Sequence, residues 1–92
     1  MSSRFGLFFG VASNKSQAAV CARVAQVLRQ EREKRGLSMN QVAERAGISQ
    51  QMVSYVERQM RNPTLETLLR IAAAIEIDVI DVMRRATKTA KK

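Results

Sequence analysis

Two short helical segments separated by a tight turn constrain the fold of this chain more than any other feature. In the stretch SMNQVAERA, Gln41 follows Ser38 at the spacing of a capping box, which marks the start of a helix. Gly47 ends this segment, and Ser49, two residues later, is a favourable N-cap for residues 50–58. The sequence ERAGIS therefore predicts a tight turn between two short helices.

Apolar residues at helical spacing predict three further helices around this pair. The first is expected from about Ser16 to a stop at Gly36. Its apolar stripe consists of Val20, Val24, Val27 and Leu28. A fourth helix should start at Pro63 and Thr64, and Asp78 can cap a short fifth helix. Since VIDVM, the one candidate for a strand, would have no partner strand, the fold class is all-α, as a five-helix domain.

The length and composition of the chain suit one small domain. Its 92 residues are 46% apolar and 26% charged, which is typical of a globular protein rather than a disordered one. We expect the domain at residues 17–86, between an apolar N-terminal tail at residues 1–16 and a basic C-terminal tail at residues 87–92.

The N-terminal tail contains the apolar stretch FGLFFGVA. It is too short to span a membrane, which takes about 20 apolar residues. Its single Arg and minimal apolar run match a secretory signal poorly. Phe5, Phe8 and Phe9 are instead candidates for packing on a second subunit, and the alternative is a poorly ordered terminus.

The charge and the missing residue types exclude several functions. A net charge of +8 favours polyanionic partners, with nucleic acid first and acidic membranes second. The chain has no histidine and one cysteine, Cys21, so it lacks the usual ligands of a zinc site and the usual partners for catalysis. We therefore expect no enzyme, no metal and no cofactor, and the lone thiol fits a reducing compartment.

The outer side of the helix at residues 50–58 is the strongest candidate for a binding site. A helical projection gathers its hydrogen-bonding side chains on one side, without an acid: Gln50, Gln51, Ser54, Tyr55 and Arg58. The opposite side is apolar, with Met52, Val53, Val56 and Met60. Glutamine offers a donor and an acceptor at once, which matches N6 and N7 of adenine in the major groove. Gln50 and Gln51 are the first residues of the second helix in a helix-turn-helix, and this position favours contacts with bases. The alternative is an exposed helix without a partner.

Residues 24–83 resemble the phage repressor/Cro family of helix-turn-helix proteins, also called the XRE type. The resemblance rests on VLRQEREKRGLS, QVAERAGISQQMVSYVE, RNPTLETLLRIAAAIEI and VIDVM, in the order and spacing of the family. It implies a five-helix domain, usually dimeric, that binds operator DNA and regulates transcription.

The resemblance also implies roles for individual residues. Positions at which the family reads bases hold Gln50, Gln51, Ser54 and Tyr55. Positions at which it touches phosphates hold Ser49, Arg61 and Asn62, and Arg58 and Asn40 are further candidates for phosphate contacts. Arg32 and Glu57 match a structural ion pair that bridges the first and third helices.

Three positions depart from the family pattern. A glutamine that grips a phosphate near the start of the second helix is Met39 here, with Asn40 as a candidate substitute. The glycines common after the third and fourth helices are Gln59 and Glu76. Because a left-handed backbone costs a residue other than glycine roughly 1 kcal/mol, we expect these two turns to have a different shape.

The sequence thus predicts a DNA-binding transcriptional regulator, most simply a cytoplasmic repressor that binds a palindromic operator in double-stranded DNA as a homodimer. Candidates for the dimer surface are Ile80 and Met83 in the fifth helix and the phenylalanines of the N-terminal tail. An antitoxin or a restriction–modification controller would use the same domain. From other classes, a protein-interaction module with a protein partner and no DNA binding remains open, as does, more weakly, a secreted membrane-active peptide. No small-molecule ligand is implied.

Overall fold

The computed structural model describes the backbone of residues 2–91 and the side chains of residues 17–88. Within this part the chain forms helices and no strand, which confirms the all-α prediction. The helices are α1 (Ser2–Lys34), α2 (Met39–Ala46), α3 (Gln50–Glu57), α4 (Leu65–Ile75) and α5 (Val79–Lys91).

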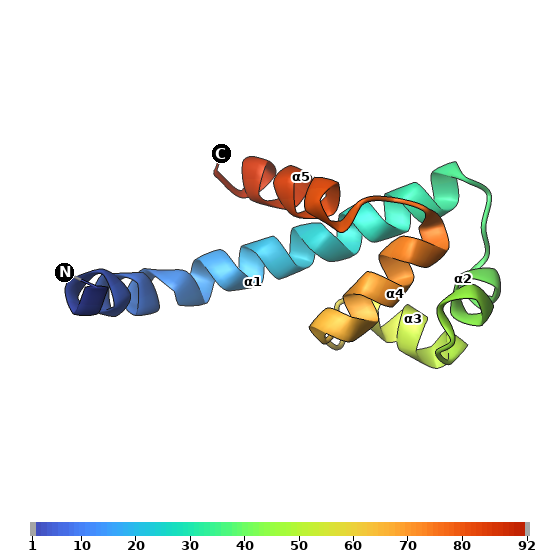
Figure 1. Cartoon of the computed structure of the whole chain (residues 1–92), viewed down its shortest axis with the longest axis horizontal. Helices are drawn as coiled ribbons and strands as arrows, with labels where there is room; N and C mark the ends of the chain where they lie inside the picture. Colours follow the sequence, from blue (N-terminus) through green and yellow to red (C-terminus); the bar gives the residue numbers. More distant parts are fainter. Residues whose placement is uncertain (1, 92) are drawn as a thin grey trace.

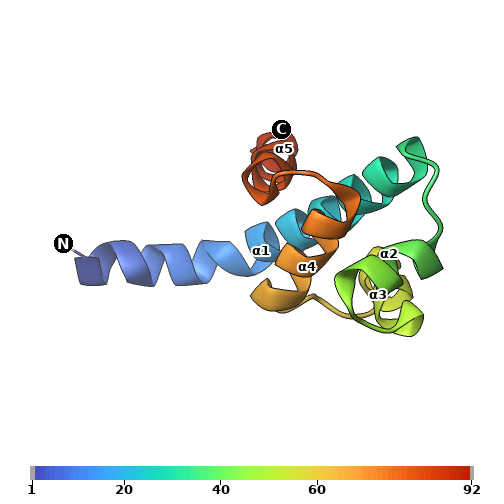
Figure 2. The same cartoon turned by 45° about the vertical axis from the view of Figure 1, so that its right-hand side comes forward.

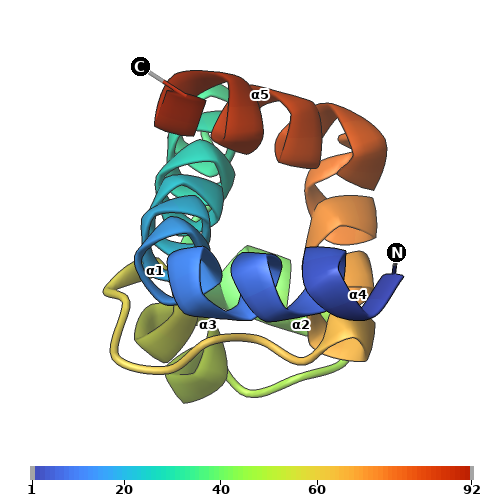
Figure 3. The same cartoon turned by 90° about the vertical axis from the view of Figure 1, so that its left-hand side faces the viewer.

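The long helix α1 organises the other four. In Figure 1, α5 lies along one side of α1, whereas α2, α3 and α4 lie on the other side. Figure 3 shows α5 and the α2–α3 pair at opposite ends of the molecule, with α4 leading from one end to the other. α1 contacts α3, α4 and α5, and α2 contacts α3 and α4. The N-terminal part of α1 extends past the other helices, as the rotated view in Figure 2 also shows.

Each of the five helices contributes aliphatic side chains to one core. The largest fully buried members are Leu28 of α1, Val42 of α2, Val53 and Val56 of α3, Ile71 and Ile75 of α4, and Val82 of α5. Burial of such side chains stabilises a domain by about 1.5–3 kcal/mol each. Because α3 is held by its inner side, its outer side remains on the surface of the molecule.

The helices start where the sequence predicted, except for α1. Ser38 accepts a hydrogen bond from the N–H of Gln41 at 3.0 Å, and the Gln41 side chain accepts one from the N–H of Ser38 at 2.8 Å. This confirms the capping box before α2. Thr64 caps α4, and the Asp78 carboxylate accepts a hydrogen bond from the N–H of Ile80 at 2.9 Å at the start of α5.

α1 and α5 are longer than the sequence predicted. α1 begins at Ser2 rather than near Ser16, and α5 runs to Lys91 instead of ending as a short helix. The predicted domain limits at residues 16 and 86 therefore fall inside helices. No proline interrupts either segment, and Ala86 is fully buried, so packing supports α5 beyond its first two turns.

The turns after α3 and α4 do not have the altered shape expected from their missing glycines. Gln59 and Glu76 have φ angles of 61° and 67°, in the left-handed region that a glycine would adopt without strain. After α3 this conformation lets the N–H of Met60 donate to the carbonyl of Tyr55 at 2.9 Å. The expectation was wrong because the hydrogen bonds that close the helix end outweigh the local backbone strain.

A buried ion pair fixes α3 to α1. The guanidinium of Arg32 donates to both carboxylate oxygens of Glu57, at 2.7 and 3.0 Å, and to the carbonyl of Leu37 at 2.8 Å. The two side chains are only 11% and 3% exposed. The hydrogen bond to Glu57 raises the pKa of Arg32 above its ordinary value, so the guanidinium stays charged. This pair orients α3 from its C-terminal end.

Candidate nucleic-acid interface

The N-terminal end of α3 is exposed and well ordered by its cap. Ser49 has an extended backbone, and its hydroxyl oxygen accepts a hydrogen bond from the N–H of Met52 at 3.0 Å. The same hydroxyl can still donate its proton outward. Ser49, Gln50 and Gln51 are all exposed, so the N-terminal end of α3 presents three polar side chains.

The two sides of α3 have opposite character. Val53 and Val56 are buried, whereas the outer side carries the exposed Gln50 and Gln51 and the half-buried Ser54 and Tyr55. The one acid of the helix, Glu57, is turned into the buried pair with Arg32. The outer side of α3 therefore offers neutral donors and acceptors with no carboxylate that would repel DNA.

Tyr55 contacts two other side chains at this surface. The Nε2 of Gln51 donates to the hydroxyl of Tyr55 at 2.6 Å. The guanidinium carbon of Arg61 lies 5.4 Å from the centre of the Tyr55 ring, a distance at which a cation is attracted to the ring face. Tyr55 thus lies between Gln51, which was also predicted to contact a base, and Arg61, which was predicted to contact a phosphate.

The predicted phosphate ligands do not all gather in one place. Ser49 and Arg58 cap the two ends of α3, and Arg61 lies against Tyr55. Asn40 is exposed in the first turn of α2. Asn62 instead lines a pocket beside α1.

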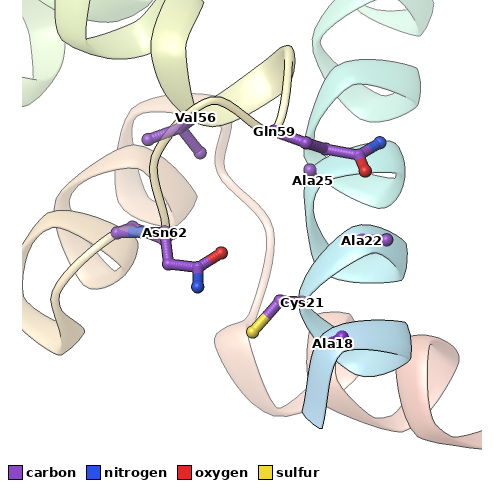
Figure 4. Close-up of a pocket in the computed structure, with 8 residues that line it drawn as sticks. Ala18, Cys21, Ala22, Ala25, Val56, Gln59 and Asn62 are labelled. Atoms are coloured by element: carbon purple, nitrogen blue, oxygen red, sulfur yellow. The ribbon is translucent and has the colours of Figure 1, made fainter. Parts of the chain in front are cut away.

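The pocket beside α1 has a volume of about 210 Å³ and lies between α1 and the chain that follows α3 (Figure 4). Its lining residues are Ala18, Cys21, Ala22, Ala25, Val56, Gln59, Asn62 and Pro63. In Figure 4 the Cys21 thiol and the Asn62 amide point into the space between the two segments, and the Gln59 side chain extends toward α1 beside Ala25. Among the residues with described side chains, no charged residue lines it. Across the described side chains no three His, Cys, Asp or Glu groups gather as metal ligands would.

Two arginines that the sequence analysis did not single out hold the helix-turn-helix against α4. Arg70 donates to the carbonyl of Ala46 at 3.1 Å, and Arg45 donates to the carbonyl of Ala74 at 3.2 Å. Each bond satisfies a carbonyl near the end of a helix, and together they tie α2 to α4. Because the partners are 24 and 29 positions apart, no local pattern predicts them.

A second group missed at the sequence level joins α5 to α1. Glu31 is buried in α1, and its carboxylate accepts hydrogen bonds from Arg35 and from Arg85 of α5, the latter at 2.8 Å. The hydrogen bonds from Arg85 and Arg35 lower the pKa of Glu31 below its usual value. This carboxylate therefore fixes the orientation of α5.

The candidate dimer residues lie in two places. Ile80 and Met83 of α5 are 62% and 37% exposed, three positions apart on one side of the helix. The side chains of Phe5, Phe8 and Phe9 lie outside the described residues. Within the part of the chain described, no helix has the length and apolar character needed to cross a membrane.

Known proteins with similar sequences are named as transcriptional regulators. The family model described as Helix-turn-helix matches residues 28–82. The chain is 36% identical over 58 residues to an uncharacterized HTH-type transcriptional regulator, y4dJ of Sinorhizobium fredii, covering 63% of this chain and 75% of that protein. It is 30% identical over 57 residues to the HTH-type transcriptional regulator SinR of Bacillus subtilis, covering 61% of this chain and 51% of SinR. The match thus spans about half the length of SinR.

Solved structures of the restriction–modification controller protein C.Esp1396I have a similar fold. A single-residue mutant matches with a TM-score of 0.70 over 75% of this chain and 90% of that chain. A second mutant, bound to its highest-affinity operator site, matches with a TM-score of 0.73 over 80% of this chain and 97% of that chain. Both are 22% identical in sequence, so the likeness concerns the fold.

Proposed function

Since this chain belongs to the XRE-type helix-turn-helix family of transcriptional regulators, we propose that it binds operator sites in double-stranded DNA in a sequence-specific manner. α3 is the recognition helix and enters the major groove with its N-terminal end. Occupation of the operator then represses transcription, because a bound protein excludes others from the same stretch of DNA.

The observation that carries this proposal is the outer side of α3. Its exposed residues are uncharged donors and acceptors, and its one acid is buried in an ion pair. Gln50 and Gln51 each offer the donor and acceptor that a bidentate contact to adenine requires, worth about 1–3 kcal/mol of discrimination per contact. Ser54 follows one turn later on the same side.

Phosphate contacts supply most of the affinity in this proposal. The chain carries a net charge of +8, and Arg58 and Arg61 lie exposed at the C-terminal end of α3. Ser49 and Asn40 add uncharged donors near the starts of α3 and α2. These groups set the register of the helix on the duplex without reading its sequence.

Binding of random duplex DNA at several salt concentrations tests the phosphate part of this proposal. We expect the logarithm of the association constant to fall linearly with the logarithm of salt concentration, with a slope of about −0.9 per phosphate contacted. Arg58→Ala and Arg61→Ala should each make the slope shallower by roughly one such contact. An affinity that does not change with salt would contradict the proposal and favour a protein partner.

We further propose that the protein acts as a homodimer through α5. Ile80 and Met83 form an exposed apolar pair on α5. This helix lies at the end of the molecule opposite α3 in Figure 3. The operator-bound structure of C.Esp1396I, whose fold this chain shares, supports an operator-binding role. A two-fold dimer predicts a palindromic operator with half-sites about 34–36 Å apart.

Sedimentation equilibrium of an Ile80→Asp variant tests the dimer surface. A charge placed in an apolar contact is desolvated without a partner, so we expect this variant to be monomeric at concentrations where the wild type is dimeric. Leu65→Asp is the matched control, because Leu65 is 71% exposed on α4 and not on α5. If the wild type is monomeric, or if both variants remain dimeric, α5 is not the interface.

Control of a restriction–modification system is a second candidate role, favoured by the fold shared with C.Esp1396I. In that case the selected operator should lie upstream of a nuclease or methyltransferase gene. Selected sites that lie elsewhere would leave general repression as the role.

A further inference from the structure

Tyr55 is connected to Gln51 and Arg61 by its side chain and to the following loop by its backbone. Its hydroxyl accepts a hydrogen bond from Nε2 of Gln51 at 2.6 Å, and its ring lies 5.4 Å from the guanidinium carbon of Arg61. Its carbonyl accepts hydrogen bonds from the N–H groups of Met60 and Arg61, at 2.9 and 3.3 Å. The ring thus lies between a group suited to bases and a group suited to phosphates.

The hydrogen bond from Gln51 leaves its base-reading atoms available. The amide nitrogen has two protons, and Tyr55 takes one of them. The second N–H and the carbonyl oxygen remain, and these are the donor and acceptor that pair with N7 and N6 of adenine. In this geometry Nε2 of Gln51 faces Tyr55, and the contact restricts the rotation of the amide.

Gln50 is a natural comparison on the same turn. It is exposed like Gln51, and among the described side chains it has no hydrogen-bond partner. A glutamine without a partner loses its side-chain freedom only when it binds. The contact with Tyr55 therefore restricts the Gln51 side chain, whereas no such contact restricts Gln50 among the described side chains.

We propose that Tyr55 is a positioning residue that links base reading to phosphate contact, rather than a residue that reads a base itself. Its hydroxyl holds the amide of Gln51, and its ring holds the guanidinium of Arg61. Cation and ring attract each other, so the loop that carries Arg61 and the amide of Gln51 are placed by one side chain. This inference rests on the proposed function, since the groups placed are those expected to contact DNA.

Two variants separate the roles of hydroxyl and ring. Tyr55→Phe removes the partner of Gln51 and keeps the ring beneath Arg61. Tyr55→Leu removes both. The loop after α3 is hydrogen-bonded to the backbone carbonyl of Tyr55, which neither variant changes, and the Tyr55 side chain is only half-buried. Both variants should therefore keep the turn after α3.

A measurement without DNA tests the ordering. The side-chain NH₂ groups of glutamines give separate NMR signals, and their relaxation reports fast motion. We expect the Gln51 amide to be more ordered than that of Gln50 in the wild type, and to become as mobile as Gln50 in Tyr55→Phe. Equal mobility of the two amides in the wild type, or an unchanged Gln51 amide in Tyr55→Phe, would overturn the proposal.

Selection of bound duplexes from random DNA tests the consequence for recognition. Tyr55→Phe should weaken base preference roughly 3- to 10-fold, at the same base pair that Gln51→Ala affects, and leave the salt dependence unchanged. Tyr55→Leu should in addition make the salt dependence shallower, as Arg61→Ala does. An effect of Tyr55→Phe at a different base pair would show that Tyr55 reads a base directly and would overturn the proposal.

The two experiments distinguish failure of the inference from failure of the proposed function. If the wild type has no base preference but the Gln51 amide loses order in Tyr55→Phe, the contact exists and sequence-specific recognition is what fails. The link to base reading is then overturned with it. If the wild type selects an operator and Tyr55→Phe selects it equally well, only the inference fails.

Discussion

The ion pairs of this protein differ widely in their exposure to solvent. The pair between Arg32 and Glu57 is nearly inaccessible to water and has bidentate geometry. In the pair between Arg29 and Glu33, by contrast, each side chain is more than half exposed. Mutual attraction in a buried pair mainly offsets the cost of removing both charges from water. The removal of one partner therefore destabilises the fold by much more than the intact pair stabilises it.

Replacement of Glu57 by Ala should lower the free energy of unfolding by about 3–5 kcal/mol, because the guanidinium of Arg32 remains charged and loses its buried partner. Urea denaturation measures this change. Glu66→Ala is the matched control, and its effect should stay below about 1 kcal/mol since its pair with Arg70 is exposed. Similar costs for both variants would mean that the Arg32–Glu57 pair is not buried.

Replacement of Gln59 or Glu76 by Gly should stabilise the protein. Each residue has a left-handed backbone, and glycine removes the strain at the cost of some unfolded-state entropy, for a net gain of roughly 0.5–1 kcal/mol. Thermal denaturation measures the gain. Gln30→Gly is the control, since glycine inside a helix such as α1 should cost about 1 kcal/mol. A loss of stability at both turn positions would contradict their left-handed conformation.

Among the helices, α5 depends most on contacts that are distant in sequence. Val82 and Ala86 bury its inner side, and Arg85 reaches Glu31 of α1 across 54 positions. The sequence predicted the start of α5 from Asp78 but not its length, because nothing local marks where it ends. α1 was misjudged for the same reason at its other end: no cap or proline sets Ser2 apart from Ser16.

The docking of α5 should weaken in acid. The pKa of Glu31 is lowered in the folded protein, so its charge stabilises the fold fully above the unfolded value of about 4.3. That contribution is lost as the pH falls through the lower, folded pKa. Glu31→Gln should therefore be less stable than the wild type at pH 7, and the difference should narrow at pH values below about 4.

Urea denaturation at pH 7 and at pH 3 measures both differences. Glu33→Gln, which alters an exposed pair on the same helix, should differ from the wild type by less at pH 7. A gap for Glu31→Gln that stays constant between the two pH values would rule out the carboxylate as the group that anchors α5.

In the molecule as a whole, the features that depend on residues close together in the sequence were predictable. Ser38 with Gln41 marks a helix start by itself, and the alternation of Val53 and Val56 with glutamines marks the inner and outer sides of α3. The contact of Arg70 with the carbonyl of Ala46 could not be predicted, because it joins elements that only the tertiary fold brings together. The left-handed Gln59 likewise follows from the packing of the turn and not from its residue type.

The same division applies to the candidate interface. The sequence placed Gln50, Gln51, Ser54 and Tyr55 on one side of one helix, since helical spacing alone decides that. It did not predict that Tyr55 would contact Gln51 and Arg61, although the spacing of four residues between Gln51 and Tyr55 is one at which side chains meet. Rotamers and loop shape, which set that contact, are properties of the folded chain.

The proposed function depends on base reading by the first turn of α3. Selection of bound sequences from random duplex DNA tests it most directly, with wild type, Gln50→Ala/Gln51→Ala and a matched Gln26→Ala/Gln30→Ala control on the exposed side of α1. We predict that the wild type and the control enrich the same inverted repeat. The α3 variant should lose base preference while it keeps weak, salt-dependent binding. An unchanged preference in the α3 variant, or no enrichment by the wild type, would contradict base reading by this turn.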